Sequence, residues 1–313
     1  MSLVSIYSNK DVIINKIKSL NEQKFDSDLQ LASYVISECI LKQYEMMRNV
    51  LNPNMIKKRF FKQELSGNQL KNALYQHIYS HNHIALTDEI FEVKNAITKY
   101  NNKLNNNQDT LMAKLLILEE YIDTFHFILE YTALLEEHYL ITLVSNKDFT
   151  VSNLNYYYVF NNKFSEQVNE MLKNEGYHII SYLYDTDQLN LELDDEFILD
   201  NLLKLNREFI RKCNFKDWKN YPDDFYSPIK FAELFKINRD MYSLCISGIG
   251  NYLNTLSFLF NSEMTFSCNS LKDVFSAIYG LYMAKREENI RRQNNDPRYT
   301  GKDEGEIVGV EVK

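Results

Sequence analysis

The 313-residue chain is 45% hydrophobic and 13% aromatic, a composition that supports a sizeable core and excludes an intrinsically disordered protein. Its 35 basic and 43 acidic residues give a formal net charge of −8, which argues against affinity of the whole protein for nucleic acid or an anionic membrane. The cysteines are too widely spaced for a disulfide framework or a zinc knuckle: Cys39, Cys213, Cys245 and Cys268.

Signals of cellular location are few in this sequence. The N-terminal residues do not pair a basic segment with an apolar one, so they do not resemble a signal peptide. No stretch approaches about 18 uncharged apolar residues, so we expect no membrane-spanning helix. Together with reduced cysteines, this predicts a cytoplasmic or intracellular protein, or a virion component, and not a secreted one. The abundance of Asn, Tyr, Ile, Phe and Lys is typical of an AT-rich genome.

Neither glycine nor proline occurs between Gly67 and Gly176. Helix interiors disfavour both residues, whereas sheets joined by tight turns need them. We therefore predict an all-α protein, a multi-helix bundle with at most a minor β element and an extended C-terminal tail. The alternating stretch Leu189–Leu193 is the candidate strand.

The first half of the chain is expected to form helices separated by capping residues and asparagines. One helix begins after Ser8, and a second covers about residues 26–49. Thr87, followed by two acidic residues, is typical of a helix N-terminus. Asn101–Asn107 indicates a loop. The clearest helix covers residues 111–144, because apolar residues recur every three or four positions and a second apolar stripe accompanies them.

The second half is expected to hold shorter helices. We predict them at residues 165–174, 195–213, 229–236, 239–247, 251–261 and 270–292. Gly176 is expected to end the first of these from the C′ position. Ser247–Gly250 lacks the third glycine and the preceding strand of a dinucleotide-binding fingerprint, so its two glycines indicate a corner between helices.

These elements suggest an N-terminal helical region, residues 1–150, and a C-terminal helical region, residues 151–296. The alternative is that both regions form a single domain. Residues 297–313 form a polar C-terminal tail with some β character. Such a tail could pair with a neighbouring molecule by strand addition.

The sharpest candidate site lies on the 111–144 helix. Asp123, His126 and Glu130 fall near one line of this helix, together with Glu119 and Glu137. Helical bundles build metal sites from carboxylates and imidazoles of this kind, completed by facing helices. The paired Glu-x-x-His motifs of di-iron bundles are missing. The alternative is a solvated flank beside the apolar stripe.

A histidine pair forms a second candidate metal site. His77 and His81 are four positions apart, a spacing with which one helix face can bind zinc. Position 78 is Ile, so the pair is not part of a metalloprotease motif. A chance grouping at a helix end, or a pH-responsive surface, would explain the pair as well.

A basic and aromatic segment forms the third candidate. Lys57, Lys58, Arg59 and Lys62 surround two phenylalanines. This mixture suits phosphate contact with base stacking, or an anchor on a membrane surface. The alternative is an amphipathic helix whose phenylalanines enter the core while the basic side chains stay in water.

No catalytic signature stands out in this sequence, so the leading hypothesis is a non-enzymatic helical protein. It would bind other proteins or form a homo-oligomer, as a structural subunit of a larger assembly such as a virion or a multiprotein complex. The 22 tyrosines and 19 phenylalanines favour contact surfaces. One alternative is a metal-dependent enzyme with a carboxylate and histidine site that holds a divalent metal. The other is a nucleic-acid-binding accessory protein that uses residues 57–62.

Overall fold

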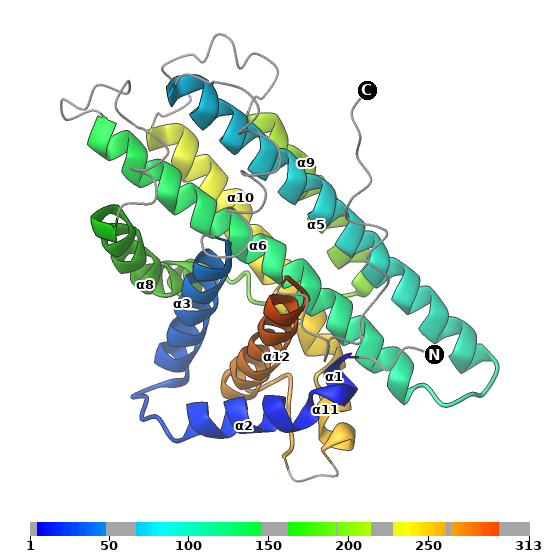
Figure 1. The fold of residues 1–313 in the computed structure, drawn as a ribbon. Helices are drawn as coiled ribbons and strands as arrows, with labels where there is room; N and C mark the ends of the chain where they lie inside the picture. The colour runs from blue at the N-terminus through cyan, green and yellow to red at the C-terminus, as the bar shows by residue number, and fades with distance from the viewer. Residues whose placement is uncertain are drawn as a thin grey trace.

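The described part of the chain is helical. The computed structural model describes residues 5–47, 67–145, 162–191, 193–213, 228–260 and 264–293. Within these ranges the regular secondary structure consists of α-helices, and no strand occurs (Figure 1). The predicted all-α class is confirmed. The candidate strand at Leu189–Leu193 is wrong for its described positions, which form a turn and irregular backbone.

Within residues 5–47 the structure has three helices: α1 (Ser5–Ser8), α2 (Lys10–Asn21) and α3 (Asp28–Met46). Ser27 caps α3, because its side chain accepts a hydrogen bond from the Gln30 N–H at 3.2 Å. The predicted helix after Ser8 is α2, which Asn9 separates from α1.

The two longest helices, α5 (Gly67–Asn105) and α6 (Leu111–Ser145), form an antiparallel hairpin that runs diagonally across Figure 1. The predicted helix start at Thr87 is wrong, because the Thr87 hydroxyl donates to the His83 carbonyl at 2.7 Å inside α5. The predicted loop is shorter than Asn101–Asn107. Asn107, with a φ of 53°, closes α5 in the left-handed region that asparagine tolerates.

The second half contains five described helices: α8 (Asn162–Asp185), α9 (Asp195–Cys213), α10 (Pro228–Tyr252), α11 (Asn254–Leu259) and α12 (Leu271–Gln293). The prediction for α9 is confirmed. The prediction that Gly176 ends a helix is wrong, since α8 continues through it. The predicted break between residues 236 and 239 is also wrong, because α10 is continuous there.

Two glycines allow close contact between helices and do not mark helix ends. A Cβ on Gly176 would lie 2.1 Å from the Ser33 carbonyl oxygen of α3. The Gly176 N–H donates to Ser37 Oγ at 3.0 Å. A Cβ on Gly248 would lie 2.3 Å from the Tyr121 ring. The predicted corner at Ser247–Gly250 is therefore wrong, and the chain leaves the helix at Leu253.

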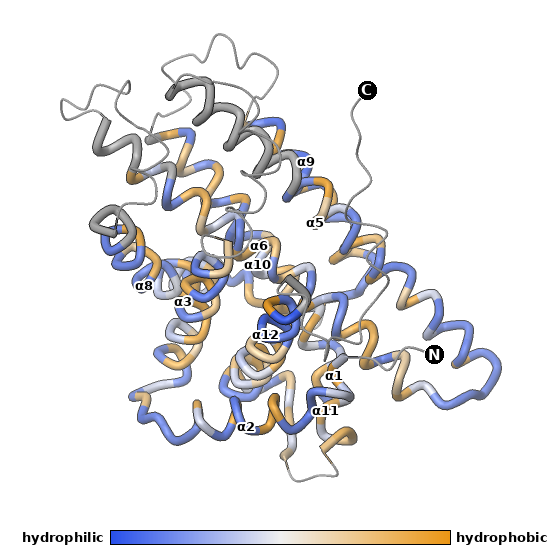
Figure 2. Tube along the Cα trace, viewed as in Figure 1, coloured by the Kyte–Doolittle hydropathy of each residue, from blue (hydrophilic) through white to orange (hydrophobic). Residues whose placement is uncertain are grey.

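Helix α6 lies at the centre of the fold. Helices α3, α5, α8, α10 and α12 all pack against it, so helices from both halves of the chain share one contiguous core. Figure 2 shows hydrophilic residues at the turn between α5 and α6 and along much of α2. The division into regions 1–150 and 151–296 stays a prediction. No described helix combines the length and the hydropathy needed to cross a membrane.

Buried polar side chains connect α6 to its neighbours. The Tyr131 hydroxyl donates to Asn206 Oδ1 of α9 at 2.8 Å, and the Asn206 amide donates to the His83 carbonyl and to Thr87 Oγ1 of α5. Thr132 donates to Asn238 of α10 at 2.6 Å. Because buried polar groups need partners, these bonds fix how α5, α6, α9 and α10 align.

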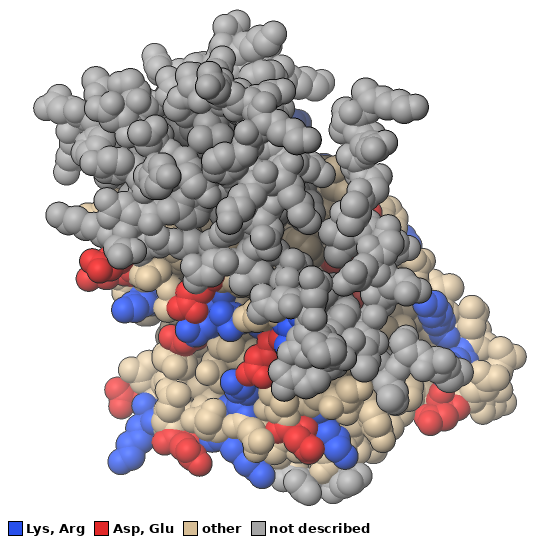
Figure 3. Space-filling model, viewed as in Figure 1, with Lys and Arg blue, Asp and Glu red and all other residues tan. Residues whose placement is uncertain are grey.

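The outer surface in the view of Figure 3 has mixed charge over α2, α3 and α12. Basic and acidic side chains are interspersed there. One ion pair between α2 and α12 joins Lys16 and Glu287 at 2.8 Å. Exposed pairs of this kind contribute about 0 to 1 kcal/mol each, so they favour solubility more than stability.

Candidate metal centre

Three carboxylates converge between α5 and α6. Glu89 and Glu92 come from α5 and Glu120 comes from α6, and one oxygen from each lies within 4.8 Å of the others. Glu120 is only 5% exposed, and the other two side chains are half-buried. Among the described residues, no second group of three or more His, Cys, Asp or Glu side chains is arranged this closely.

The spacing of the acids along each helix explains the convergence. Glu89 and Glu92 are three positions apart, so both lie on one face of α5. Glu120 and Asp123 have the same spacing on α6. Since the two helices pack as an antiparallel hairpin, their acidic faces meet. We call Glu89, Glu92, Glu120 and Asp123 the acidic belt.

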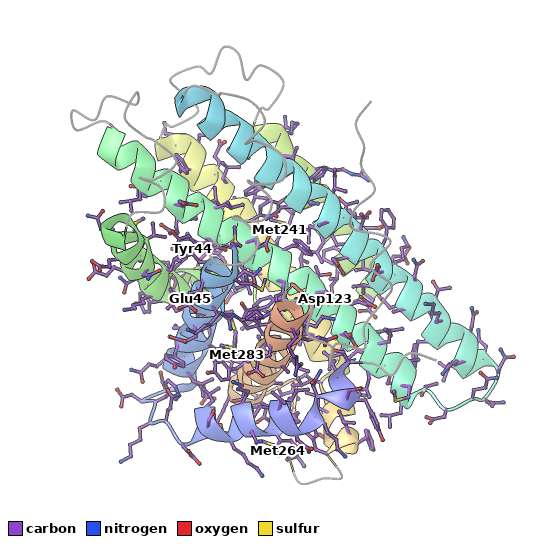
Figure 4. All side chains as sticks on the ribbon, viewed as in Figure 1. Tyr44, Glu45, Asp123, Met241, Met264 and Met283 are labelled. Carbon is purple, nitrogen blue, oxygen red and sulfur yellow. The ribbon has the colours of Figure 1, made fainter. Side chains whose placement is uncertain are left out.

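Lys285 of α12 lies at the edge of the acidic belt. Its ammonium group is 2.8 Å from Asp123 and 3.0 Å from Glu119, and its side chain is only 10% exposed. The backbone N–H of Ser5 donates to the second oxygen of Glu119 at 2.8 Å. Figure 4 shows Asp123 on α6 beside α12. This contact joins α1, α6 and α12 at the belt.

Negative charge exceeds positive charge at this place. Glu89, Glu92 and Glu120 lie within 4.8 Å of one another, and the ammonium group of Lys285 pairs with Asp123 and Glu119 at the edge of this cluster. Burial raises the pKa of Glu89 to about 9, and the charges of Asp123, Glu92 and Glu120 add to the increase, whereas Lys285 opposes it. Glu89 therefore keeps a proton at neutral pH, because so many carboxylates this close cannot all ionise.

The chemistry of this donor set favours hard divalent cations. Carboxylate oxygens are the preferred ligands of Mg²⁺, Ca²⁺ and Mn²⁺. The three convergent side chains include neither imidazole nor thiolate, the ligands typical of structural zinc sites. A bound cation would replace the proton on Glu89 and offset part of the negative charge of the carboxylates.

The predicted ligands Asp123, His126 and Glu130 have three different sets of partners. Asp123 belongs to the acidic belt and pairs with Lys285. His126 is buried, its Nδ1–H donates to the Ile122 carbonyl at 2.9 Å, and its ring lies 4.5 Å from that of Tyr282. Burial lowers the pKa of His126 to about 3, so the ring is neutral. The alternative of a solvated flank is wrong for this face of α6.

Glu130 lies further along α6, where it faces α3. Its carboxylate accepts a hydrogen bond from Gln43 Nε2 at 2.7 Å, and both side chains are buried. Burial raises the pKa of Glu130 to about 7, against the effect of the amides of Gln43 and Asn82. Glu130 and its amide neighbours therefore form a buried polar cluster that is separate from the acidic belt.

The remaining candidates are only partly described. His77 and His81 lie on α5, and their side chains are outside the described part of the chain. Lys57, Lys58, Arg59 and Lys62 also lie outside the described residues. The histidine pair and the basic segment therefore stay predictions.

Sequence reasoning missed three of the four acidic belt residues. Glu89 was assigned to the first turn of a helix, which hid its pairing with Glu92. The signal that could have revealed the site is the repeat of two acids three positions apart on neighbouring helices, Glu89 with Glu92 and Glu120 with Asp123.

Comparison with known proteins found no family model, no curated protein and no solved structure that matches this chain.

Proposed function

We propose that this protein binds a divalent cation, Mg²⁺ or Mn²⁺, through Glu89, Glu92 and Glu120 and is a metal-dependent enzyme that acts on a phosphorylated substrate. The observation that carries the proposal is the convergence of three carboxylate oxygens within 4.8 Å between two neighbouring helices. Asp123 adds negative charge beside the site. The leading hypothesis from the sequence is a non-enzymatic protein. The proposal instead takes up the alternative of a metal-dependent enzyme and assigns its ligands to both helices of the hairpin.

The substrate class is part of the proposal, and the coordination chemistry of these cations supports it. Mg²⁺ prefers six oxygen ligands, and in proteins it is usually held by one or two carboxylates, by water and by substrate phosphates. Such an ion neutralises charge on a phosphoryl group and lowers the pKa of a bound water. The reaction class is hydrolysis of a phosphoester or phosphoanhydride. The water oxygen bonds to phosphorus, the phosphorus–oxygen bond to the leaving group breaks, and the water proton passes to solvent or to the leaving group.

A hydrolysis assay tests the proposal. Phosphate and pyrophosphate release would be followed with a panel of nucleoside triphosphates and sugar phosphates, with Mg²⁺, with Mn²⁺ and with EDTA. We expect metal-dependent turnover of at least one substrate, lowered more than about 100-fold in Glu92→Gln and Glu120→Gln. The matched control is Glu166→Gln on the exposed surface of α8, which should keep full activity.

The outcomes separate the two parts of the proposal. Metal binding without turnover of any panel member would refute the enzymatic part and leave a metal-binding protein. Equal activity in EDTA, or in the Glu92→Gln and Glu120→Gln variants, would refute the role of the acidic belt.

A second candidate function is the non-enzymatic subunit of a larger assembly. The end of the α5–α6 hairpin projects beyond the neighbouring helices in Figure 1. Phe91 and Leu104 on α5 are 45% and 52% exposed, and exposed apolar side chains are available for contact with another protein. Light scattering of the wild type and of a Phe91→Ser/Leu104→Ser variant tests this. A strictly monomeric wild type at high concentration would count against self-association.

A further inference from the structure

Glu130 lies where α3, α5, α6 and α12 meet. Its neighbours at this junction are fully or almost fully buried: Gln43 of α3, Asn82 of α5 and Tyr282 of α12. The junction lies more than two helical turns along α6 from Glu120, so it is separate from the three convergent carboxylates.

A chain of hydrogen bonds crosses the junction. The Tyr282 hydroxyl donates to Gln43 Oε1 at 3.0 Å, and Gln43 Nε2 donates to Glu130 Oε1 at 2.7 Å. The Tyr282 ring also lies 4.5 Å from the ring of His126, at an angle of 32°. Through these contacts Glu130 helps to hold α12 and α3 against α6.

Several other titratable groups face this junction. They are Cys39 and Glu45 of α3, His126 and Tyr131 of α6, Tyr242 of α10, and Tyr282, Lys285 and Arg286 of α12. Asn82 of α5 is uncharged.

The buried members of this set keep one charge state at neutral pH. Burial raises the pKa values of Cys39 and of the three tyrosines, so these groups stay protonated. Although burial alone would lower it, Asp123 and Glu119 raise the pKa of Lys285, which stays charged. Arg286 is also charged, because guanidinium groups do not deprotonate in proteins. His126 is neutral.

We infer that Glu130, held by Gln43, which Tyr282 contacts in turn, is a proton-linked latch that keeps α12 and α3 docked on α6 when it is protonated and weakens their docking when it ionises. The inference goes beyond the proposed function and does not depend on it. The reason is that the described junction offers a charged Glu130 two neutral amide groups and no ion pair, which is a poor replacement for water.

The direction of the pH effect follows from linkage. The pKa of Glu130 is raised from 4.5 to about 7, so the folded state binds this proton more tightly than the unfolded state. The stabilisation is complete below about pH 4.5 and is lost as the pH rises to about 7. Over that interval the contribution of Glu130 to the folding equilibrium constant falls about 300-fold.

Urea unfolding of the metal-free protein in EDTA tests the latch. Wild type and Glu130→Gln, which resembles the neutral acid, would be compared between about pH 5 and about pH 8. We expect the variant to gain stability relative to the wild type as the pH rises, with the gain levelling off above about pH 7. A stability difference that does not change with pH would overturn the inference. The control is Glu166→Gln, whose stability difference should be constant.

Two further measurements keep the test decisive if Glu130→Gln does not fold. Carboxyl carbon NMR of the wild type, labelled at glutamate, should show a resonance that titrates near pH 7, and its absence would overturn the inference. Gln43→Met removes a hydrogen bond that favours the charged carboxylate, so it should move this midpoint to higher pH. An unchanged midpoint in Gln43→Met would refute the role of Gln43 in the titration of Glu130. Because EDTA is present throughout, these results are independent of metal binding.

Discussion

Replacing Gly176 by alanine tests how α3 and α8 cross. The new Cβ would lie 2.1 Å from the Ser33 carbonyl oxygen and 2.6 Å from the Ser37 nitrogen, and both are backbone atoms that cannot rotate away. The helices must therefore separate by roughly 1 Å to restore a normal contact. Overpacking of this kind costs about 3 kcal/mol.

Two smaller terms also contribute to the change in unfolding free energy of Gly176→Ala. Separation of the helices weakens the bond from the Gly176 N–H to Ser37 Oγ, worth about 1 kcal/mol. The better helix propensity of alanine returns about 1 kcal/mol. We therefore expect Gly176→Ala to lose about 3 kcal/mol of unfolding free energy, measured by urea denaturation.

Gly250→Ala on α10 is the matched control. A Cβ there would meet no atom closer than 3.7 Å, so only the propensity change remains and stability should stay equal or rise by up to about 1 kcal/mol. If Gly176→Ala proves as stable as Gly250→Ala, α3 and α8 do not cross as closely at Gly176 as described.

Two other substitutions test the buried polar contacts. Lys285→Met should destabilise the protein by about 3 to 5 kcal/mol in thermal and urea unfolding at neutral pH, because it leaves Glu119 and Asp123 buried without their ammonium partner. A loss below about 1 kcal/mol would contradict that. Asn206→Leu should cost about 2 to 4 kcal/mol, since it removes the partner of the buried Tyr131 hydroxyl, whereas Asn201→Ala on the same helix should change stability by less than about 0.5 kcal/mol. Equal effects of the two asparagine variants would show that the hydrogen bond between Tyr131 and Asn206 does not stabilise the protein.

Local patterns in the sequence predict α6 and α9 correctly, because the side chains of each helix carry the signals of a helix themselves. The apolar repeat of residues 111–144 identified α6 because Leu115, Leu118 and Phe125 are all fully buried. The acids at the start of α9 and the basic residues at its end also favoured that helix. In α9 charge and hydrophobic period agree, whereas α6 carries no such charges at its ends and is identified by its hydrophobic period.

The errors arose where tertiary contacts override local signals. Thr87 and Gly176 have the residue types of helix ends, yet each lies inside a helix. Thr87 satisfies its hydroxyl within α5, and Gly176 makes room for α3. A single sequence contains the residue type but not the neighbouring helix that explains it.

The site was predicted in part for the same reason. Asp123 was found because acids and a histidine share one line of α6. Its partners are far away in the chain: Glu89 belongs to α5, and Lys285 of α12 is 166 positions from Glu119. Spacing within one helix cannot place residues of three helices around a common point, so the acidic belt required the fold.

The most direct test of the central claim is a calorimetric titration of the purified, untagged protein with Mn²⁺ and Mg²⁺ at neutral pH, in two buffers of different ionisation enthalpy. The account predicts about one site per chain, release of up to about one proton as Glu89 ionises, and loss of binding in Glu120→Gln. Absence of binding, or binding that is unchanged in Glu120→Gln, would contradict the account.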